Sequence, residues 1–397
     1  MADLLTIDDA IERVLAHVRP LGAEPVSAEL ATGRVLAEPA RATVDLPPFD
    51  SSAMDGFAVR AADTPGTLPV RVRIAAGKPA PRSLRPAEAM AIATGGAVPD
   101  GADAVVPIEY VVDRDNEVEI SQPARVGANI RPCGGDVQFG EIVVREGVLL
   151  TPAHLGAIAA AGVAEVRCAR RPRAAVLTTG TELRSPGERL EPGQVYEANG
   201  PLLAAQLSSA GAVVQRMPVA VDQVEAHREA IARGLDSDVL VTSGGVSVGP
   251  HDLVRRVEAE LGVEEVFWRV AVKPGKPIAF GVRNGTLVFG LPGNPVSSLV
   301  GFELFVRPAV LALQGLFDPR PRFEQGRLAR AVARDAHRDQ FLRARAAPAD
   351  GTTSLDPLAG QESHMIVRAA EANALVHIPR GDGDLVAGAS VRYLRLA

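Results

Sequence analysis

Two of the three lysines in this chain lie in one short loop, Val272-Lys273-Pro274-Gly275-Lys276-Pro277, although the chain has 42 basic residues. An ammonium group is a compact point charge with three freely directed donors, whereas a guanidinium group is a planar fork. The pair therefore indicates a small anion, such as an oxyanion or a phosphate oxygen. The prolines and the glycine stiffen the loop and let its backbone approach a ligand. A solvated pair of surface lysines is the alternative.

A glycine-rich segment, Thr242 to Gly249, follows a predicted strand and precedes a predicted helix. Backbone N–H groups in such a turn, together with the positive end of the helix, form a cradle for an anion. The segment also contains G-x-S-x-G, the pattern of a hydrolase nucleophile elbow, with Ser247 as the nucleophile. An elbow requires a strand that leads almost directly into the serine, but Thr242 to Gly245 already break the strand. Phosphate or polar-ligand binding is favoured, with a hydrolase or a purely structural turn as alternatives.

Three carboxylates are expected near the same edge of the sheet. Glu182 lies in the polar loop Thr178–Leu183, Asp222 precedes a predicted helix, and Asp252 follows the glycine-rich turn. Mg²⁺ typically takes one or two carboxylates, waters and substrate phosphate oxygens. Glu182 and Asp252 are the candidate metal ligands, whereas Asp222 also has the position of a helix N-cap. The seven histidines show no spacing typical of a transition-metal site.

A further strand-to-helix connection, Phe289 to Ser297, contains Pro-Gly-Asn-Pro. This turn directs N–H groups and Ser297 towards the edge from which the lysines emerge. Anion binding at the helix start is one interpretation, and a proline-stiffened helix entry is the other.

The elements that would position these residues alternate between about residues 172 and 318. Strands are expected at 174–177, 212–220 and 238–241, and helices at 201–210 after Asn199 as cap, at 223–233 after Asp222 as cap, and at 251–261. This alternation predicts a parallel α/β sheet with right-handed crossovers. Such sheets bind ligands at the carboxyl ends of their strands.

The whole chain has 397 residues, which is more than a single hydrophobic core usually holds. We therefore expect further domains outside the α/β region. Thr6 is expected to cap a first amphipathic helix, and Thr151-Pro152 to begin another that ends near Gly162. If these helices pair, residues 1–42 and 141–171 form a helical stem domain, and the β-rich segment 43–140 is an insertion into it. Residues 172–318 form the α/β domain, and residues 319–397 form a C-terminal β domain.

Composition excludes several classes of protein. Hydrophobic residues make up 47% and charged residues 23%, as in a soluble globular protein. The net charge of −6 gives no footprint for nucleic acid. No apolar run has the length of a membrane span, and the N-terminus does not resemble a signal peptide. Two cysteines, Cys133 and Cys168, are too few for a disulfide framework, which favours a cytoplasmic location.

Three segments of the β-rich region, at 47–57, 94–99 and 131–136, are interpreted from composition as loops. Together with the motifs above, several stretches resemble the molybdopterin molybdenumtransferase family, known as MoeA in bacteria and represented by the C-terminal domain of gephyrin. They are PPFDSSAMDGFAV, TGGAVPDGADAVV, TTGTEL with PGQVYEANG, SGGVSVGPHD, VKPGKP and GLPGNPVS. The SGGVSVG loop also occurs in pterin adenylyltransferases and CinA-like proteins. The SAMDG stretch and the four-part layout favour the transferase.

The resemblance implies a cytoplasmic homodimer that carries out the last step of molybdenum cofactor synthesis. It implies that adenylylated molybdopterin is hydrolysed with Mg²⁺ to release AMP, and that molybdate joins the dithiolene. Possible partners are the pterin adenylyltransferase and apo-molybdoenzymes, with no nucleic acid and no membrane. The alternatives are a serine hydrolase that uses Ser247 and a non-enzymatic scaffold like gephyrin.

The resemblance also carries residue roles onto this chain. The catalytic candidates are Asp55, Asp136, Asp222, Lys273 and Lys276. The substrate-binding candidates are Thr94, Thr179, Glu182, Asn199, Ser243, Gly244, Gly245, Ser247, Pro277, Pro292, Asn294, Ser297, Arg343 and Ser363, of which Arg343 and Ser363 would complete the molybdate pocket. The metal ligands are Glu182 and Asp252. His364, beside Ser363, has no interpretation from its spacing.

Overall fold

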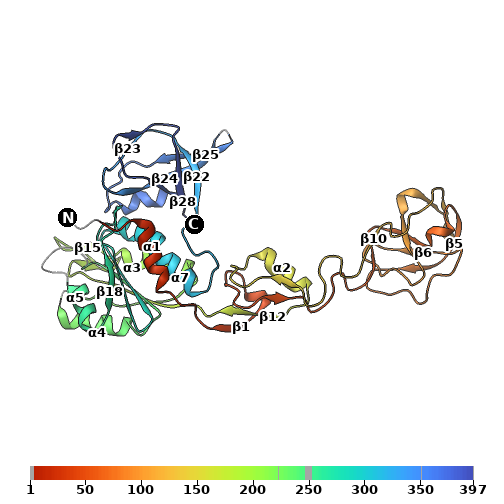
Figure 1. Cartoon of the computed structure of the whole chain (residues 1–397), viewed down its shortest axis with the longest axis horizontal. Helices are drawn as coiled ribbons and strands as arrows, with labels where there is room; N and C mark the ends of the chain where they lie inside the picture. Colours follow the sequence, from red (N-terminus) through yellow and green to blue (C-terminus); the bar gives the residue numbers. More distant parts are fainter. Residues whose placement is uncertain (1–3, 222, 246–252, 350, 397) are drawn as a thin grey trace. The chain divides into compact units, whose positions relative to one another are not determined.

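The computed structural model describes residues 4–221, 223–245, 253–349 and 351–396. They form two compact units (Figure 1). The first unit comprises Met1–Glu24, Gly33–Ala37 and Ala169–Ala397, and the second comprises Pro25–Thr32 and Glu38–Cys168. The combination of an α/β sheet, a β-rich segment and a C-terminal β region confirms the predicted fold class. The boundaries of the four-part division stay a prediction.

The first unit contains a six-stranded sheet in the order β16-β13-β17-β21-β20-β18. Its strands are β13 (Arg173–Thr178), β16 (Val213–Arg216), β17 (Val239–Ser243), β18 (Glu264–Trp268), β20 (Ala279–Arg283) and β21 (Thr286–Leu291). The first four strands in that order are parallel, as predicted, whereas β20 and β18 add an antiparallel edge. The hairpin between β20 and β21 turns at Asn284 and Gly285, which both have a positive φ. An Asn-Gly pair with this geometry is typical of a type I′ turn.

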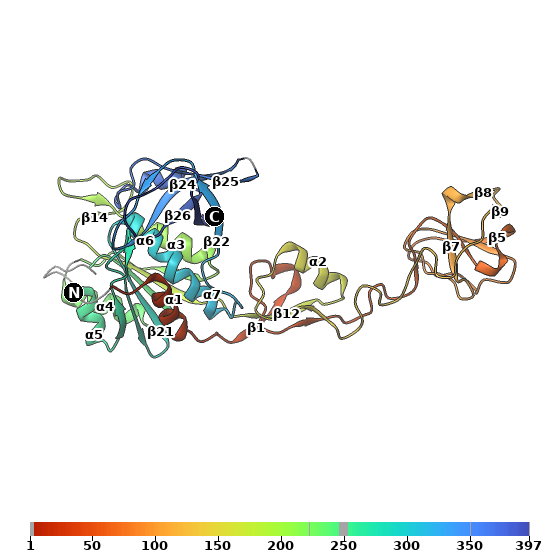
Figure 2. The same cartoon turned by 45° about the horizontal axis from the view of Figure 1, so that its top comes forward.

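Helices cover both faces of this sheet. Side chains alternate between the two faces along each strand, and in the buried strands both sets are apolar, so both faces must be covered. In β13, Ala174 and Val176 join one apolar cluster, and Ala175 and Leu177 join another. The first cluster holds α1 (Ile7–Ala16), α3 (Asn199–Ser209), α6 (Pro295–Gly301), η4 (Phe302–Val306) and α7 (Arg307–Leu313), and the second holds α4 (Val224–Gly234) and α5 (Leu253–Glu260) (Figure 2). The predicted strand-to-helix alternation is therefore a layered α/β core.

Helix α1 begins where the sequence predicts, with the Thr6 hydroxyl accepting a hydrogen bond from Asp9 N at 3.1 Å. Its apolar face packs against η4 and α7 of the first unit. The predicted helix after Thr151, α2 (Pro152–Ala160), belongs to the second unit. The amphipathic pattern thus identifies both helices, but the expected stem of residues 1–42 and 141–171 is not one of the compact units.

The second unit is built around a sheet in the order β7-β4-β6-β5-β9-β8. Its strands are β4 (Gly56–Val59), β5 (Gly66–Ile74), β6 (Ala89–Ile92), β7 (Ala104–Pro107), β8 (Val111–Asp113) and β9 (Glu117–Ile120). Strand β2 (Ala40–Arg41) pairs with β11 (Ile142–Val144), where the chain enters and leaves this segment. The predicted β-rich character of residues 43–140 is confirmed.

The C-terminal region forms a sheet in which β24 (Asp339–Ala349) pairs with both β25 (Thr352–Pro357) and β26 (Ala374–Ile378), while β22 (Phe323–Leu328) and β28 (Ser390–Arg395) complete it. An unexpected strand also joins this sheet. The start of the lysine loop, β19 (Val272–Lys273), pairs in parallel with β24, with Lys273 opposite Gln340. The lysine loop is therefore attached to the C-terminal sheet.

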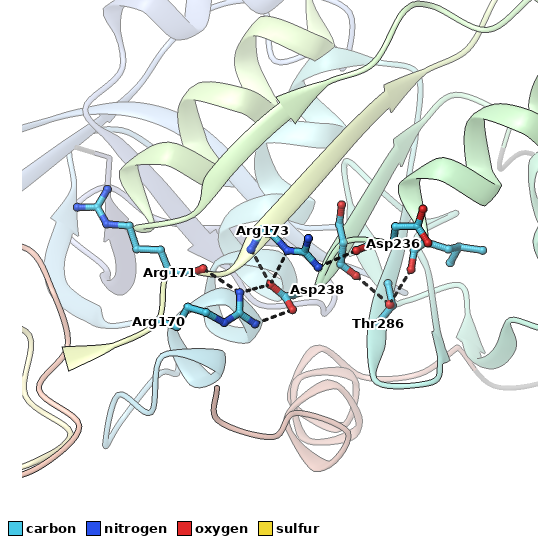
Figure 3. A network of polar contacts seen from close by, with 8 residues as sticks. Arg170, Arg171, Arg173, Asp236, Asp238 and Thr286 are labelled. Carbon is cyan, nitrogen blue, oxygen red and sulfur yellow. Dashed lines mark hydrogen bonds and ion pairs between the residues drawn. The ribbon is translucent and has the colours of Figure 1, made fainter. Parts of the chain in front are cut away.

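The amino ends of the parallel strands are joined by a polar network (Figure 3). Both Asp238 carboxylate oxygens accept hydrogen bonds from Arg170 at 3.0 Å, and Arg173 N donates to the same carboxylate at 2.7 Å. Burial raises the pKa of Asp238, but these hydrogen bonds and charges outweigh burial and lower the pKa overall. Because the network lies at the edge opposite the carboxyl ends of the strands, we interpret it as structural.

One helical run, Pro295–Leu313, has the length and apolar composition of a membrane span, but 78% of it is buried within the protein. It forms part of the larger apolar cluster of the first unit. Its hydrophobicity is therefore explained by its position in the core.

Candidate functional site

The loops that follow three neighbouring parallel strands line one pocket of about 770 Å³. They contribute Thr178–Gly180 after β13, Ser243–Gly245 after β17, and Pro292–Asn294 after β21. We call this hollow the strand-end pocket. Its position at the carboxyl ends of the strands is the usual ligand position in a parallel α/β sheet.

Close backbone packing explains the glycines of this pocket. Thr179 N donates to Ser243 O at 3.0 Å, and Gly244 N donates to Leu291 O at 3.1 Å, so the three loops are hydrogen-bonded in sequence. Gly244 has a φ of +98°, and a Cβ atom there would lie 2.7 Å from Thr179 O. Only glycine fits this position without displacing the neighbouring loop.

Asn199 connects two of these loops. Its Nδ2 donates to Ser243 Oγ at 2.8 Å and to Gly293 O at 2.7 Å. The expectation that Asn199 caps α3 is wrong, because Ala198 is the N-cap and Asn199 is already helical. The side chain is instead used across the pocket. Its Oδ1 is buried and has no hydrogen-bond partner among the described residues.

Glu182 supplies an exposed carboxylate to the strand-end pocket. The carboxylate lies close to the backbone of Gly180, since a Cβ atom on that glycine would be 2.7 Å from both of its oxygens. The other metal candidate, Asp252, lies outside the described residues, as do Ser247 and Asp222. Within the described ranges, no group of three or more His, Cys, Asp or Glu side chains could hold a metal ion by itself.

The N-cap of α4 is Gln223, so the expectation that Asp222 caps this helix is wrong. The helix begins at Val224, one residue later than predicted. The acidic role that the resemblance gives to Asp222 stays a prediction.

The two lysines of the loop are exposed, and neither lines the strand-end pocket, although Pro277 does. Lys273 Nζ lies 3.4 Å from Asp335 Oδ2, whereas Lys276 lines a different pocket. The loop packs against the start of α6, because a Cβ atom on Gly275 would lie 3.7 Å from Ser297 O. Ser297 is buried at 3% exposure, so its side chain does not lie open beside the lysines.

Residues 360–366 bring two further side chains to the pocket, His364 and Ile366. Asn294 Nδ2 donates to Ser363 Oγ at 2.8 Å, and Val296 N donates to Ser363 O at 3.0 Å. Ser363 therefore attaches this segment to the start of α6. Spacing alone did not identify His364; its only signal in the sequence is its position beside Ser363.

Arg343 holds the same segment from inside the protein. Its guanidinium group is fully buried and donates to the carbonyls of Gly360 at 2.6 Å, Glu362 at 3.3 Å, and Met365. Burial lowers the pKa of Arg343. These hydrogen bonds position the segment 360–366, and the role of Arg343 in completing the molybdate pocket stays a prediction.

In the second unit, the three segments interpreted as separate loops pack together. Ser52 N donates to Gly96 O at 2.9 Å, and β3 (Ser51–Ser52) pairs with β10 (Ile130–Arg131). Cys133 N donates to Asp50 Oδ1 at 2.7 Å. Segments 47–57, 94–99 and 131–136 thus pack together and form one surface.

Asp55 and Thr94 interact directly on this surface. Thr94 N donates to Asp55 Oδ1 at 2.7 Å, and this bond, with a smaller contribution from the threonine side chain, lowers the pKa of Asp55. The carboxylate is therefore charged at neutral pH, which suits an acceptor or a ligand better than a proton donor. Asp136 is exposed, and its N–H donates to Leu46 O at 2.9 Å.

Comparison with known proteins covers nearly the whole chain. Residues 5–162 match the family described as MoeA N-terminal region (domain I and II), and residues 325–396 match MoeA C-terminal region (domain IV). Residues 175–312, which contain the strand-end loops, match a probable molybdopterin binding domain.

Among curated proteins, molybdopterin molybdenumtransferase 2 of Mycobacterium tuberculosis is 39% identical, with 96% of this chain and 97% of that protein covered. Molybdopterin molybdenumtransferase of Staphylococcus aureus is 31% identical over 98% of this chain and 94% of that protein.

Two solved structures of a molybdopterin biosynthesis MoeA protein from Pyrococcus horikoshii are also similar. One is 33% identical with a TM-score of 0.84 and covers 99% of both chains. The other is 26% identical with a TM-score of 0.85 and covers 99% of this chain and 100% of that one. With full-length relatives that are named as transferases, neither a serine hydrolase nor a purely non-enzymatic scaffold is the favoured class. The chain belongs to the molybdopterin molybdenumtransferase family and is a transferase of molybdenum cofactor biosynthesis.

Proposed function

We propose that this enzyme inserts molybdate into adenylylated molybdopterin and releases AMP in a Mg²⁺-dependent reaction. The observation that carries the proposal is the convergence of three strand-end loops on one pocket beside the lysine loop. A volume of about 770 Å³ is within the range of about 300–1,000 Å³ that is typical of small-molecule sites.

The pterin and its pyrophosphate would bind in the strand-end pocket. Gly244 and Gly245 keep the backbone free of side chains there, which supports close approach of phosphate oxygens to N–H groups. Thr179 and Ser243 add hydroxyl groups at the ends of neighbouring strands. His364 lines the same pocket, and its imidazole would be the group that exchanges a proton with the substrate.

Glu182 fits a metal of this kind, because Mg²⁺ usually takes only one or two protein carboxylates and completes its shell with waters and substrate phosphates. Asp252 is the second proposed ligand, by resemblance. When bound, the metal would neutralise charge on the pyrophosphate and favour attack at the adenylyl phosphorus.

Lys273 and Lys276 would hold molybdate next to the freed dithiolene, so the protein would contribute proximity. A pair of unit charges about 4 Å apart is worth ~1 kcal/mol in water and ~4 kcal/mol at an effective dielectric constant of 20. Two exposed lysines therefore bind a dianion usefully only when the substrate, or another part of the dimer, closes the site. Lys273 Nζ also lies 3.4 Å from a carboxylate oxygen of Asp335, which partly neutralises its charge, so Lys276 is the lysine more available to molybdate.

We also propose a cytoplasmic homodimer, in which Asp55 and Asp136 of one protomer help to close the strand-end pocket of its partner. The pterin adenylyltransferase and apo-molybdoenzymes are the proposed protein partners, as supplier of the substrate and recipients of the product.

Purified enzyme incubated with adenylylated molybdopterin, Mg²⁺ and molybdate tests the proposal. We expect AMP and active cofactor to form together, and both to require Mg²⁺. Retention of intact adenylylated substrate with all components present would contradict the proposed reaction. AMP release without cofactor formation would contradict only the proposed role of Lys273 and Lys276 in holding molybdate.

A further inference from the structure

The strand-end pocket contains one exposed aromatic ring. Tyr196, in β15 (Val195–Tyr196), lines the pocket and is 47% exposed. Among the described residues that line this pocket, it is the only phenylalanine, tyrosine or tryptophan. An exposed aromatic face in a small-molecule site offers a surface on which a planar ring can stack.

The Tyr196 ring is held in place although it is exposed. Its hydroxyl group donates to Glu188 O at 2.9 Å, and its backbone belongs to β15, which pairs in parallel with β14 (Leu183–Arg184). Val195 N, one residue earlier, donates to Glu182 O at 3.0 Å. A side chain that is already held at its hydroxyl group and at its backbone loses little conformational entropy when a ligand binds. The ring is therefore preorganised.

The residues that follow Tyr196 attach its segment to the sheet. Glu197 is buried, and its carboxylate accepts hydrogen bonds from Gly200 N at 2.5 Å and from Arg216 Nη2 at 3.2 Å. Arg216 belongs to β16, which pairs with β13 at the edge of the sheet. The Asn199 side chain joins the same segment to the two further loops described above. These contacts fix the position of Tyr196 relative to the strand-end loops.

Tyr196 and the lysine loop lie at opposite ends of the strand-end pocket. The Tyr196 segment follows the loop after β13 and is attached to β16 through Glu197. Pro277, the residue of the lysine loop that lines the pocket, lies two residues before β20. Strands β13 and β20 are three positions apart in the sheet, which is about 14 Å at the usual strand spacing. The two ends can therefore receive different parts of one extended ligand.

We infer that Tyr196 stacks against the adenine ring of the adenylylated substrate, and against that of AMP once it is released. The inference rests on the proposed function, because it takes the dithiolene to be held at the lysine loop. The pterin is fused to the ring that carries the dithiolene, so it lies at that end, and the adenine lies beyond the pyrophosphate at the other end. Stacking uses only the face of the base, so Tyr196 contributes binding and takes no part in bond making.

Calorimetric titration of the full-length protein with AMP in the presence of Mg²⁺ tests the inference. Tyr196→Leu should weaken AMP binding about tenfold, because it removes the aromatic face and keeps an apolar side chain. Tyr196→Phe retains the face and should bind AMP nearly as tightly as wild type. Ribose 5-phosphate lacks the base, so Tyr196→Leu should bind it as wild type does. Phe317→Leu is the matched control, since that exposed ring of the same unit does not line the pocket.

Three results would overturn the inference. They are unchanged AMP binding in Tyr196→Leu, an equal loss for AMP and ribose 5-phosphate, and a loss for hydroxymethylpterin that exceeds the loss for AMP. If Tyr196→Leu is unfolded in thermal scans, the wild-type protein carries the test. Its Tyr196 ring protons should then show nuclear Overhauser effects to the adenine ring protons of bound AMP, and their absence would contradict stacking.

Turnover separates the role of Tyr196 from the proposed function. With adenylylated molybdopterin, Tyr196→Leu should raise KM about tenfold and leave kcat unchanged, because stacking is the same in the ground state and the transition state. If wild-type enzyme releases AMP and the variant has an unchanged KM, only the role of Tyr196 is wrong. If the wild-type enzyme itself releases no AMP, the proposed function is wrong.

Discussion

Lys276 differs from the arginines of this chain in the geometry of its charge, and that difference can be tested. We expect Lys276→Ala to raise the molybdate concentration needed for half-maximal cofactor formation by about tenfold, because one of two proposed dianion contacts is lost. Binding of adenylylated molybdopterin should change little. Molybdate titrations at saturating pterin provide the measurement.

Two further variants separate charge from shape at this position. Lys276→Arg retains the charge but presents a planar fork, so it should restore only part of the lost affinity. Lys78→Ala removes the third lysine of the chain, which lies in the second unit, and should leave the titration unchanged. Identical molybdate curves for Lys276→Ala and Lys78→Ala would rule out the role of Lys276.

The Asp55 carboxylate allows a prediction about its ionisation. Its pKa is lowered by the backbone N–H of Thr94 and, to a smaller extent, by the Thr94 side chain. Thr94→Val removes only the hydroxyl group, so the pKa of Asp55 should rise part of the way towards its ordinary value near 3.8. Carbon-13 NMR titration of the Asp55 carboxyl group would show this change. An unchanged or lower pKa in the variant would contradict it.

At the scale of elements, Asp238 fixes the starts of strands β13 and β17. Asp238→Asn should lower the free energy of unfolding by about 1–3 kcal/mol, because Arg170 and Arg173 N lose a charged acceptor in a half-buried site. The neighbouring Asp236→Asn is the control, since that side chain is exposed. Chemical denaturation at pH 7 gives the comparison.

The difference in free energy of unfolding between wild type and Asp238→Asn should also depend on pH. The folded pKa of Asp238 is lowered, so its stabilisation is fully present above the unfolded pKa of ~3.9 and is lost as the pH falls towards the folded pKa. The stability difference between wild type and Asp238→Asn should therefore shrink below about pH 4. A difference that persists unchanged at pH 3 would show that the charge is not its cause.

Gly244 tests the packing of the strand-end loops. Gly244→Ala places a Cβ atom 2.7 Å from Thr179 O at a φ of +98°, and should weaken pterin binding at least tenfold through displacement of the loop. Gly187→Ala has a similar φ of +95° with open space around the new atom, so it reports backbone strain alone. Binding lost equally in both variants would mean that the close contact is unimportant.

Several elements follow from local patterns in the sequence, and their partners do not. The cap at Thr6 and the apolar stripe predict α1, but nothing in that stripe distinguishes a stem helix from a helix on the α/β core. Likewise, two residues, Val272 and Lys273, are too short a strand to recognise before the C-terminal sheet provides a partner. Local sequence determines whether a segment forms a helix or a strand, whereas segments distant in the sequence determine what that helix or strand packs against.

At the scale of the whole molecule, mixed dimers test the proposed sharing of a site between protomers. Asp55→Asn and Lys276→Ala protein should each be impaired alone, whereas random mixing should restore about a quarter of wild-type activity, because half of the dimers regain one of two sites. Mixing Asp55→Asn with Asp136→Asn should restore nothing, since both changes affect the same side of the shared site. Equal recovery in both mixtures would contradict the arrangement.

The candidate site shows the same division between local and global information. Glycine and hydroxyl motifs after successive strands predict the strand-end pocket, because a parallel sheet brings strand ends to one edge. Sequence did not reveal the buried role of Arg343 or the position of His364, since both depend on how residues 360–366 fold back.

The scarcity of lysine has a practical consequence. An amine-selective acylating reagent has only three side-chain targets in this chain, and two of them, Lys273 and Lys276, are exposed in the loop described above. Mass spectrometry of the acylated protein would therefore read out, almost without background, whether a bound ligand shields that loop.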